Sequence, residues 1–501
     1  MKISNLYKKR SKDISTVKNI LILGNAEYGV TNEVLEIENE KDIIRTYGRN
    51  SSIYQSYKEI KNEVGNYEIS VFALKYNGEH ATASFKVNSK EEVIEEALVF
   101  KSIYSNEMYN DVSINITLTG IEMIFPFFLE LDKKIYHYTD FPNLYMLMKK
   151  INEDTVNGDN IVFVYSTIDE YTEFDESFYY INESKKLSCG NSGLNDTNND
   201  KFKALELSYE LIQGLEIDYI VLSDIYYNDT VTYRYLDGRT CSFYEQLLSF
   251  CVSQLRFSII SLGIMQVNTA GVENSKVSIN ESINDVISLI DITHSNYTLS
   301  QFRFLIAIMY DFLIKKQDFS KFNSSLVIAF ELSKIQTSGN ITGKPLNEDY
   351  YLNLFLDEEQ IRLLNEKGIM TFRLSPYYNR VVATNGLTNY TSQDSSLNDY
   401  NNEYKYLTSV VLLQNTIPKL KSIFNDRIGE SIYELEREKA LEDDLTVVLN
   451  ELVKKGVLEK YSTSIDYSVE NCSINFEVIL QNMFVTEGIK YIGKLSYNDL
   501  E

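Results

Sequence analysis

ILILGNAEYGVT, residues 20–31, is an apolar run that ends at Gly24, followed by a second glycine at Gly29 and a hydroxyl at Thr31. This is the frame of a phosphate-binding loop, GxxxxGK[ST], but Val30 stands where the lysine should be. Valine supplies no charge for phosphates, and no helix is expected before residue 39, so no helix N-terminus would face them. The pattern favours a glycine-punctuated turn between strands. A nucleotide site that has lost its lysine stays a rival interpretation.

Around this turn, residues 20–88 predict the order strand, strand, helix, helix, strand. The first helix begins at Asn39 and stops at Gly48, and a serine opens the second, over residues 51–64. Residues 67–76, YEISVFALKY, form an apolar strand. This is an α/β unit.

Further along, the same alternation of helices and strands continues. Strands are expected at 112–118, 217–222, 257–262 and 369–374, and helices at 144–151, 201–213, 242–255, 301–314 and 357–367. The closing block is helical to about residue 455, with Leu441, Leu445, Val448 and Leu452 on one face of its last helix. Two strands, 473–480 and 487–495, follow it. The expected fold class is mixed α/β (α+β), with C-terminal helices followed by paired strands.

Composition excludes several classes of function. The chain has 501 residues and a formal net charge of −24, which repels nucleic acid and anionic membrane surfaces. No apolar run reaches the length of a membrane span, and the charged start MKISNLYKKRSK lacks the apolar stretch of a signal peptide. The expectation is therefore no nucleic acid, no membrane, and assembly in the cytosol.

The sequence also holds no pattern that predicts catalysis. Its three histidines are scattered, its four cysteines lack zinc-ligand spacing, and no GxSxG or HExxH occurs. Acidic clusters such as Asp169–Glu176 are typical of a solvated face. We expect no enzyme activity, no metal and no cofactor.

The order of the pieces resembles that of contractile tail sheath proteins of bacteriophages and phage-tail-like particles. The residues that carry this resemblance are the Gly24 to Gly29 turn with Asn32, the Tyr47-Gly48 stop before Ser51, Tyr109-Asn110-Asp111-Val112, LSCGNSG at 187–193, LEIDYIVL at 215–222, and Leu363-Leu-Asn365 with Lys367-Gly-Ile369. Val30 replaces the proline that is usual in the family. A longer N-terminal arm with a P-G-V-Y stretch is absent, and residues 266–350 match no part of the pattern.

The resemblance implies four parts: an N-terminal arm (1–19), a small α/β domain (20–88), a central domain with outward-facing insertions (89–350), and a C-terminal domain with a terminal strand arm (351–501). It implies a structural subunit that polymerises as stacked hexameric rings around a tail tube and contracts to drive the tube through a cell envelope. The partners would be other copies of the chain, the tube protein, and baseplate and tail-terminator proteins. Assembly in the host bacterial cytoplasm would place it in a virion tail or tail-like particle.

Terminal strands that join sheets of neighbouring subunits would hold such an array together. The residues expected in this strand mesh are Ile3, Leu6, Tyr7, Phe476, Val478, Leu480, Ile489, Tyr491, Ile492 and Leu495. Gly24, Gly29 and Gly48 are expected to shape the structural turn. Two alternatives stay open: a sheath-like collar or tail-terminator ring that does not contract, and a nucleotide-binding enzyme with a degenerate phosphate loop.

Overall fold

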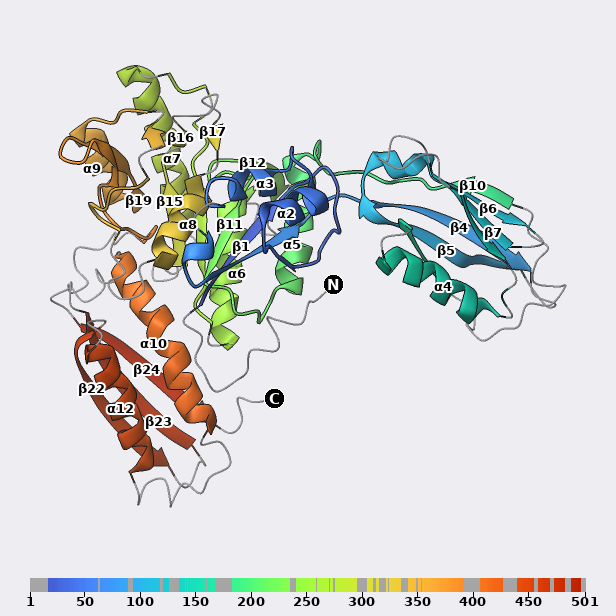
Figure 1. The fold of residues 1–501 in the computed structure, drawn as a ribbon. Coiled ribbons are helices and arrows are strands. Elements are labelled where there is room, and N and C mark those ends of the chain that lie inside the picture. The colour runs from blue at the N-terminus through green and yellow to red at the C-terminus, as the bar shows by residue number, and fades with distance from the viewer. Residues whose placement is uncertain are drawn as a thin grey trace.

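A seven-stranded sheet forms the centre of the computed structural model (Figure 1). Its order is β19-β15-β14-β11-β1-β3-β2, and neighbours run parallel except for the antiparallel β2–β3 pair. In that order the strands are Ile369–Met370, Leu305–Ile308, Leu262–Gln266, Tyr219–Leu222, Lys18–Gly24, Ile69–Lys75 and Leu35–Glu36. Ile20 to Leu23, the run quoted first above, are fully buried at the middle of this sheet. The mixed α/β class expected from the sequence is confirmed.

The structure describes residues 17–61, 64–88, 93–117, 120–125, 135–139, 141, 143–157, 160–166, 183–234, 240–257, 259–269, 271–273, 275–294, 304–309, 312–314, 321–322, 324–334, 341–347, 350–352, 354–390, 406–426, 439–454, 458–468, 473–482 and 488–496.

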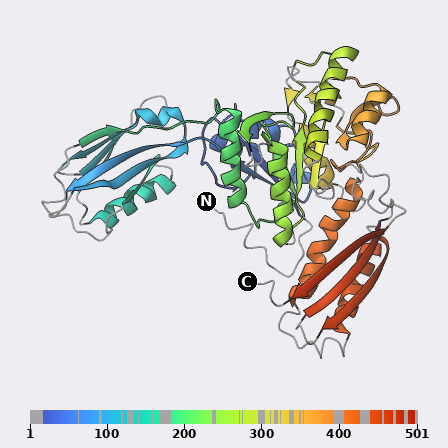
Figure 2. The same cartoon turned by 180° about the vertical axis from the view of Figure 1, so that it is seen from behind.

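Helices cover both faces of the central sheet. One pair is α3 (Ser52–Tyr57) and α8 (Ser324–Lys334), which contact each other and β1. The other is α5 (Asn198–Leu211) and α6 (Phe243–Gln254), of which α6 packs on β14 and β15. Figures 1 and 2 show the two pairs on opposite faces. Parallel strands buried on both faces account for the continuous apolar runs at residues 20–23 and 219–222.

Further helices and small sheets complete the core. Helix α2 is Glu40–Tyr47, capped by the Asn39 side chain as the sequence predicts, and α7 and α9 are Lys276–His294 and Glu358–Glu366. Small antiparallel sheets are formed by β12 (Thr230–Arg234) with β13 (Thr240–Ser242), by β17 (Lys321–Phe322), β16 (Phe312–Ile314) and β18 (Tyr350–Leu352), and by β20 (Phe372–Ser375) with β21 (Arg380–Ala383).

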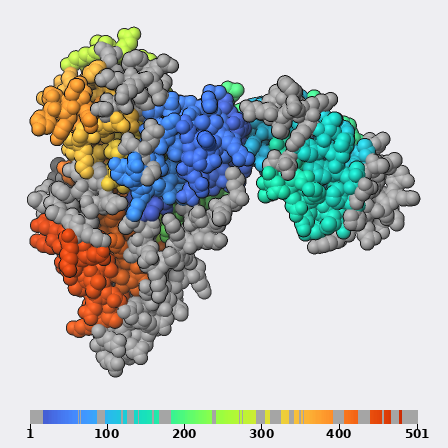
Figure 3. All heavy atoms as spheres, viewed as in Figure 1, coloured from blue at the N-terminus to red at the C-terminus, as the bar shows by residue number. Residues whose placement is uncertain are grey.

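A separate unit is inserted between β3 and α5, and we call it the inserted module (residues 79–192). It contains the sheets β4-β5-β9 and β10-β6-β7-β8, packed with helix α4 around their own apolar core. Its elements are β4 His80–Asn88, β5 Val93–Ser105, β6 Ser113–Thr117, β7 Gly120–Ile124, β8 Ile135–Thr139, α4 Leu144–Asn157, β9 Val162–Ser166 and β10 Glu183–Lys186. Figure 3 shows it set apart from the rest of the molecule.

The C-terminal unit follows the core. Helices α10 (Leu407–Asp426) and α12 (Ala440–Lys454) precede the antiparallel sheet β22-β23-β24, formed by Leu458–Ser468, Ser473–Asn482 and Gly488–Ser496. The order of helices followed by paired strands agrees with the sequence prediction, but β22 was not foreseen. On α12, Leu449 is fully buried where Val448 was expected, since Val448 is only half-buried.

Several predicted elements differ from the structure. The helix expected over 51–64 is shortened to α3, and the strand expected at 369–374 is divided into β19 and β20, which belong to different sheets. Residues 301–314 were expected to be a helix, and the structure has β15 and β16 there. A short, fully buried apolar run carries no periodicity that separates strand from helix. The strand expected at 257–262 begins only at Leu262, because Leu255–Phe257 forms a 3₁₀ turn after α6.

The central sheet draws its strands from all four expected domains. β1 begins at Lys18, within the expected arm (1–19), and continues into residues 20–88, which also contain β2 and β3. β11, β14 and β15 lie within 89–350, and β19 lies beyond 351. The boundary at 88 also falls between β4 and β5, which pair in the inserted module. The units that the sheets define are therefore a discontinuous core, the inserted module and the C-terminal unit.

Candidate assembly site

The C-terminal sheet is held from one side by two helices. The face of α12 that contains Leu441, Leu445, Leu449 and Leu452 is buried, and α12 packs on β22 while α10 contacts β23. The Tyr461 hydroxyl lies 3.0 Å from Asn450 Oδ1, which ties β22 to α12. Ser462, Ser464 and Asp466 on β22 are exposed. Polar residues on an outer face are typical of an antiparallel sheet with one side in water.

The predicted mesh residues of β23 lie in the middle of this sheet. β23 pairs with β22 on one side, Phe476 with Ile465, and with β24 on the other. Val478 and Leu480 are fully buried within their own chain. Both edges of β23 are therefore occupied, and its backbone is not available to a neighbouring subunit while the sheet is intact.

The other predicted mesh strand is at the edge. In β24, Ile489 pairs with Leu480 and Tyr491 with Val478, and Ile492 and Leu495 continue the strand. Among the described residues, β24 has no second strand partner, and the outer edge of β22 has none either. An open strand edge presents unpaired N–H and C=O groups, which is the chemistry of strand addition. Ile3, Leu6 and Tyr7 lie outside the described residues.

The glycine turn has a distinct role for each glycine. Gly29 (φ +121°) and Gly48 (φ +85°) adopt backbone conformations that favour glycine. A Cβ on Gly29 would lie 2.8 Å from the Thr46 carbonyl oxygen, and a Cβ on Gly24 would overlap Ser223 Oγ. The turn thus brings β1 and the loop after it close to α2, α3 and the end of β11.

The same turn makes a poor phosphate site. After Thr31 the chain enters β2, and α2 begins only at residue 40. The Gly29 carbonyl accepts hydrogen bonds from Ser105 N (3.1 Å) and Ser105 Oγ (3.2 Å), and the Thr31 hydroxyl lies 3.0 Å from Ser105 Oγ. The Thr31 hydroxyl, at the position that a phosphate loop keeps for magnesium, is therefore occupied by protein groups.

A lysine does lie beside this turn, and sequence reasoning missed it. Lys75 is fully buried at the end of β3, where its ammonium group donates hydrogen bonds to the Ser105 carbonyl (3.1 Å) and Ser105 Oγ. Burial lowers its pKa to about 7, against the smaller opposing effect of Glu107 and Asp196. Ser105 belongs to the inserted module, so Lys75 links that module to the core. In the sequence, the signal for this buried lysine was the position of Lys75 near the end of the apolar run YEISVFALKY.

In the described part of the chain, burial makes Cys251 and His80 unreactive. The Cys251 thiol is buried, and burial raises its pKa to about 12. Burial also lowers the pKa of His80 to about 4, which leaves its ring neutral near pH 7. Within the described ranges, no group of His, Cys, Asp and Glu could hold a metal ion, and no helix is long and apolar enough to cross a membrane.

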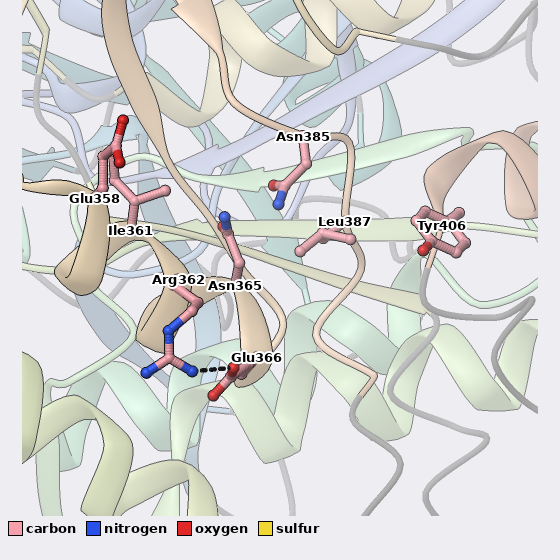
Figure 4. Close-up of a pocket in the computed structure, with 8 residues that line it drawn as sticks. All are labelled: Glu358, Ile361, Arg362, Asn365, Glu366, Asn385, Leu387 and Tyr406. Atoms are coloured by element: carbon pink, nitrogen blue, oxygen red, sulfur yellow. Dashed lines mark hydrogen bonds and ion pairs between the residues drawn. The ribbon is translucent and has the colours of Figure 1, made fainter.

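One open pocket, of about 420 Å³, lies between α9 and the loop before α10 (Figure 4). Its lining residues are Glu358, Ile361, Arg362, Asn365, Glu366, Asn385, Leu387 and Tyr406. Arg362 is paired with Glu366 at the rim, and Asn365 accepts a hydrogen bond from the Thr371 hydroxyl. The lining offers amides and an ion pair but no nucleophile beside a base, so it suggests no catalysis.

Comparison with solved structures shows which known proteins have a similar fold. The sheath tail protein of Desulfitobacterium hafniense aligns with 97% of this chain and 98% of its own length, at 12% sequence identity and a TM-score of 0.55. The sheath tail protein of Listeria innocua aligns with 96% of this chain and 95% of its own, at 12% identity and a TM-score of 0.55. No protein-family profile and no curated protein sequence matches the chain. The chain thus has the fold of sheath tail proteins over nearly its whole length.

Proposed function

We propose that the chain is the structural subunit of a contractile tail sheath, which polymerises as stacked hexameric rings around a tail tube. The observation that carries the proposal is the full-length match to two sheath tail proteins, from the core strands to the terminal sheet. Contraction would drive the tube through a cell envelope. No nucleotide is needed for this, because two subunit packings that differ in buried surface can store the energy.

The terminal strands are the proposed connectors between subunits. The outer edge of β24 would accept an extended segment of a neighbour, and the segment with Ile3, Leu6 and Tyr7 is the proposed donor. Main-chain hydrogen bonds give such a contact its strength, and a flexible connection lets the subunits rotate. Phe476, Val478 and Leu480 then act as the support of this edge, since β23 holds β24 in register.

The proposed partners are other copies of the chain, the tube protein, and the baseplate and terminator proteins at the two ends. Assembly would take place in the host bacterial cytoplasm, before the sheath becomes part of a virion tail or tail-like particle. A collar or terminator ring of the same fold is the second candidate. It would form closed rings but no tubes.

Two matched variants of the N-terminal segment test the strand mesh. A variant in which Ile3, Leu6 and Tyr7 are all changed to Ser should form no large assemblies that sediment, because the added strand loses its side-chain anchors. A control variant in which Lys8, Lys9 and Arg10 are all changed to Ser should still form assemblies that sediment, since these residues follow the apolar positions. Equal sedimentation of both variants at every concentration would exclude the segment from the mesh.

A further inference from the structure

An aromatic hairpin tip is exposed at one side of the core. We define the hairpin tip as Leu374, Tyr377, Tyr378 and Arg373, between β20 and β21. Tyr377 is 86% exposed and Tyr378 50%, and their rings form an edge-to-face pair with centroids 4.8 Å apart. Tyr351 and Phe355, on and after the neighbouring strand β18, are also exposed. Large exposed aromatic groups that cluster in this way are typical of contact surfaces.

The sequence around the tip is basic, although the chain as a whole is strongly acidic. Residues 367–390 contain Lys367, Arg373 and Arg380 and no Asp or Glu, whereas the whole chain has a net charge of −24. Lys367 is paired with Asp291 on α7. Arg373 is exposed and has no carboxylate partner among the described residues. The tip therefore suits an apolar surface that is flanked by acidic groups.

Helix α5 presents such a surface, which we call the leucine stripe: Glu206, Leu207, Glu210 and Leu211. Leu207 is 56% exposed and Leu211 53%, although leucines on a helix of this kind normally face the core. The glutamates are exposed, and in the part of the chain that the structure describes neither has a cationic partner. The buried face of the same helix is formed by Leu205, Ser208 and Tyr209.

The two surfaces match in size as well as in charge. Residues four apart on a helix have Cβ atoms about 6 Å apart, so Leu207 and Leu211 form a row one turn long. The two tyrosine rings, 4.8 Å apart, are of a size to cover that row. Arg373 would then lie near Glu206 or Glu210, where opposite charges steer the approach and set the register.

One chain cannot make this contact with itself. The hairpin follows β19, the edge strand of the central sheet, whereas α5 leads into β11, with β15 and β14 in between. Figures 1 and 2 both show α9 and β19 on one side of the core and α5 on the other. Two different surfaces that fit each other on separate copies make a head-to-tail contact, which builds rings or open arrays.

We infer that the hairpin tip of one subunit docks on the leucine stripe of a second copy of this chain. The inference rests on the proposed self-assembly and adds a specific contact beside the strand mesh. A hairpin on a helix buries less than the roughly 1,200 Å² of a stable interface. The contact is therefore weak alone and acts when the strand mesh already holds the subunits together.

The test measures the critical concentration for assembly by sedimentation. Tyr377→Ala with Tyr378→Ala should raise this concentration about tenfold, the effect of losing one aromatic anchor pair. Tyr165→Ala, at an exposed tyrosine of β9, is the matched control and should leave it unchanged. Unaltered thermal melting of the monomers would show that no variant is misfolded, as expected for side chains that are mostly exposed.

A charge exchange then identifies the partner surface. Arg373→Glu and Glu210→Lys should each raise the critical concentration, and both in one chain should restore it, because the exchanged pair attracts again. If the wild-type protein forms tubes and every variant assembles as well as the wild type does, the contact is overturned. The proposed function would still stand. Weak dimers that depend on the hairpin, with no tubes, would support the contact and contradict the sheath. No association of any kind would overturn both.

Discussion

Substitutions at Gly29 and Gly343 separate the cost of backbone strain from the cost of a steric clash made by an added Cβ atom. Both have positive φ, +121° and +71°, but a Cβ on Gly343 would meet nothing within 4 Å. Gly343→Ala should therefore lower the free energy of unfolding by about 1 kcal/mol, the cost of a left-handed residue. Gly29→Ala should lower it by about 3 kcal/mol, since its Cβ also meets Thr46 O at 2.8 Å. Urea unfolding measures both, and equal losses would contradict the described packing of the turn.

Lys75 should make stability rise with pH. In the folded chain its pKa is about 7, while the unfolded chain has the ordinary value near ~10.4. Between these values the unfolded state binds more protons, so the free energy of unfolding increases with pH by up to about 1.4 kcal/mol per unit. In the wild type, Lys75 should contribute about 2 kcal/mol to the rise in the free energy of unfolding between pH 7 and pH 9, and Lys75→Met should remove this contribution. Lys41→Met, at an exposed lysine, should keep the wild-type dependence. An unchanged gain in Lys75→Met would contradict the buried position.

At the residue scale, glycines that interrupt a pattern are easier to recognise in the sequence than a buried charge. Gly24, Gly29 and Gly48 stand out because they interrupt apolar or helical patterns. Lys75 could not be placed, since its partner Ser105 is thirty residues away and only tertiary structure brings the two together. The hairpin tip was also missed, because two adjacent tyrosines after a proline are ordinary loop sequence.

The inserted module should be removable as one element. Its ends meet at the Glu79–Asn191 bridge, and its apolar core is separate from that of the central sheet. A chain with residues 79–192 replaced by two glycines, and with Lys75→Met because Ser105 is lost, should fold with a cooperative melt. The same residues expressed alone should also fold. Loss of cooperative melting in the shortened chain would show that the core needs the module.

Elements with capped ends were predicted better than buried strands. Helices α2 and α9 begin at Asn39 and Asp357 as expected, because their caps are local side-chain contacts. Strands β15 and β16 were mistaken for a helix, and in β15 all four residues are buried, which removes the periodicity that separates strand from helix. The edge position of β24 depends on strand order, which sequence alone does not contain.

For the whole molecule, the charge of −24 and the open sheet edges have opposite effects. Repulsion would keep free subunits apart, and the proposed strand addition would join them. The strand order of the core sheet could not be predicted from the sequence, because the sheet is assembled from segments far apart in the chain. The order of motifs nevertheless pointed to the fold that the two solved sheath tail proteins share with this chain.

Electron microscopy of the purified, concentrated protein without any partner tests the central claim most directly. A sheath subunit with an open β24 edge should polymerise on its own into long hollow tubes of stacked six-fold rings. Closed rings without tubes would favour a collar or terminator of the same fold. A compact monomer at every concentration would contradict the account.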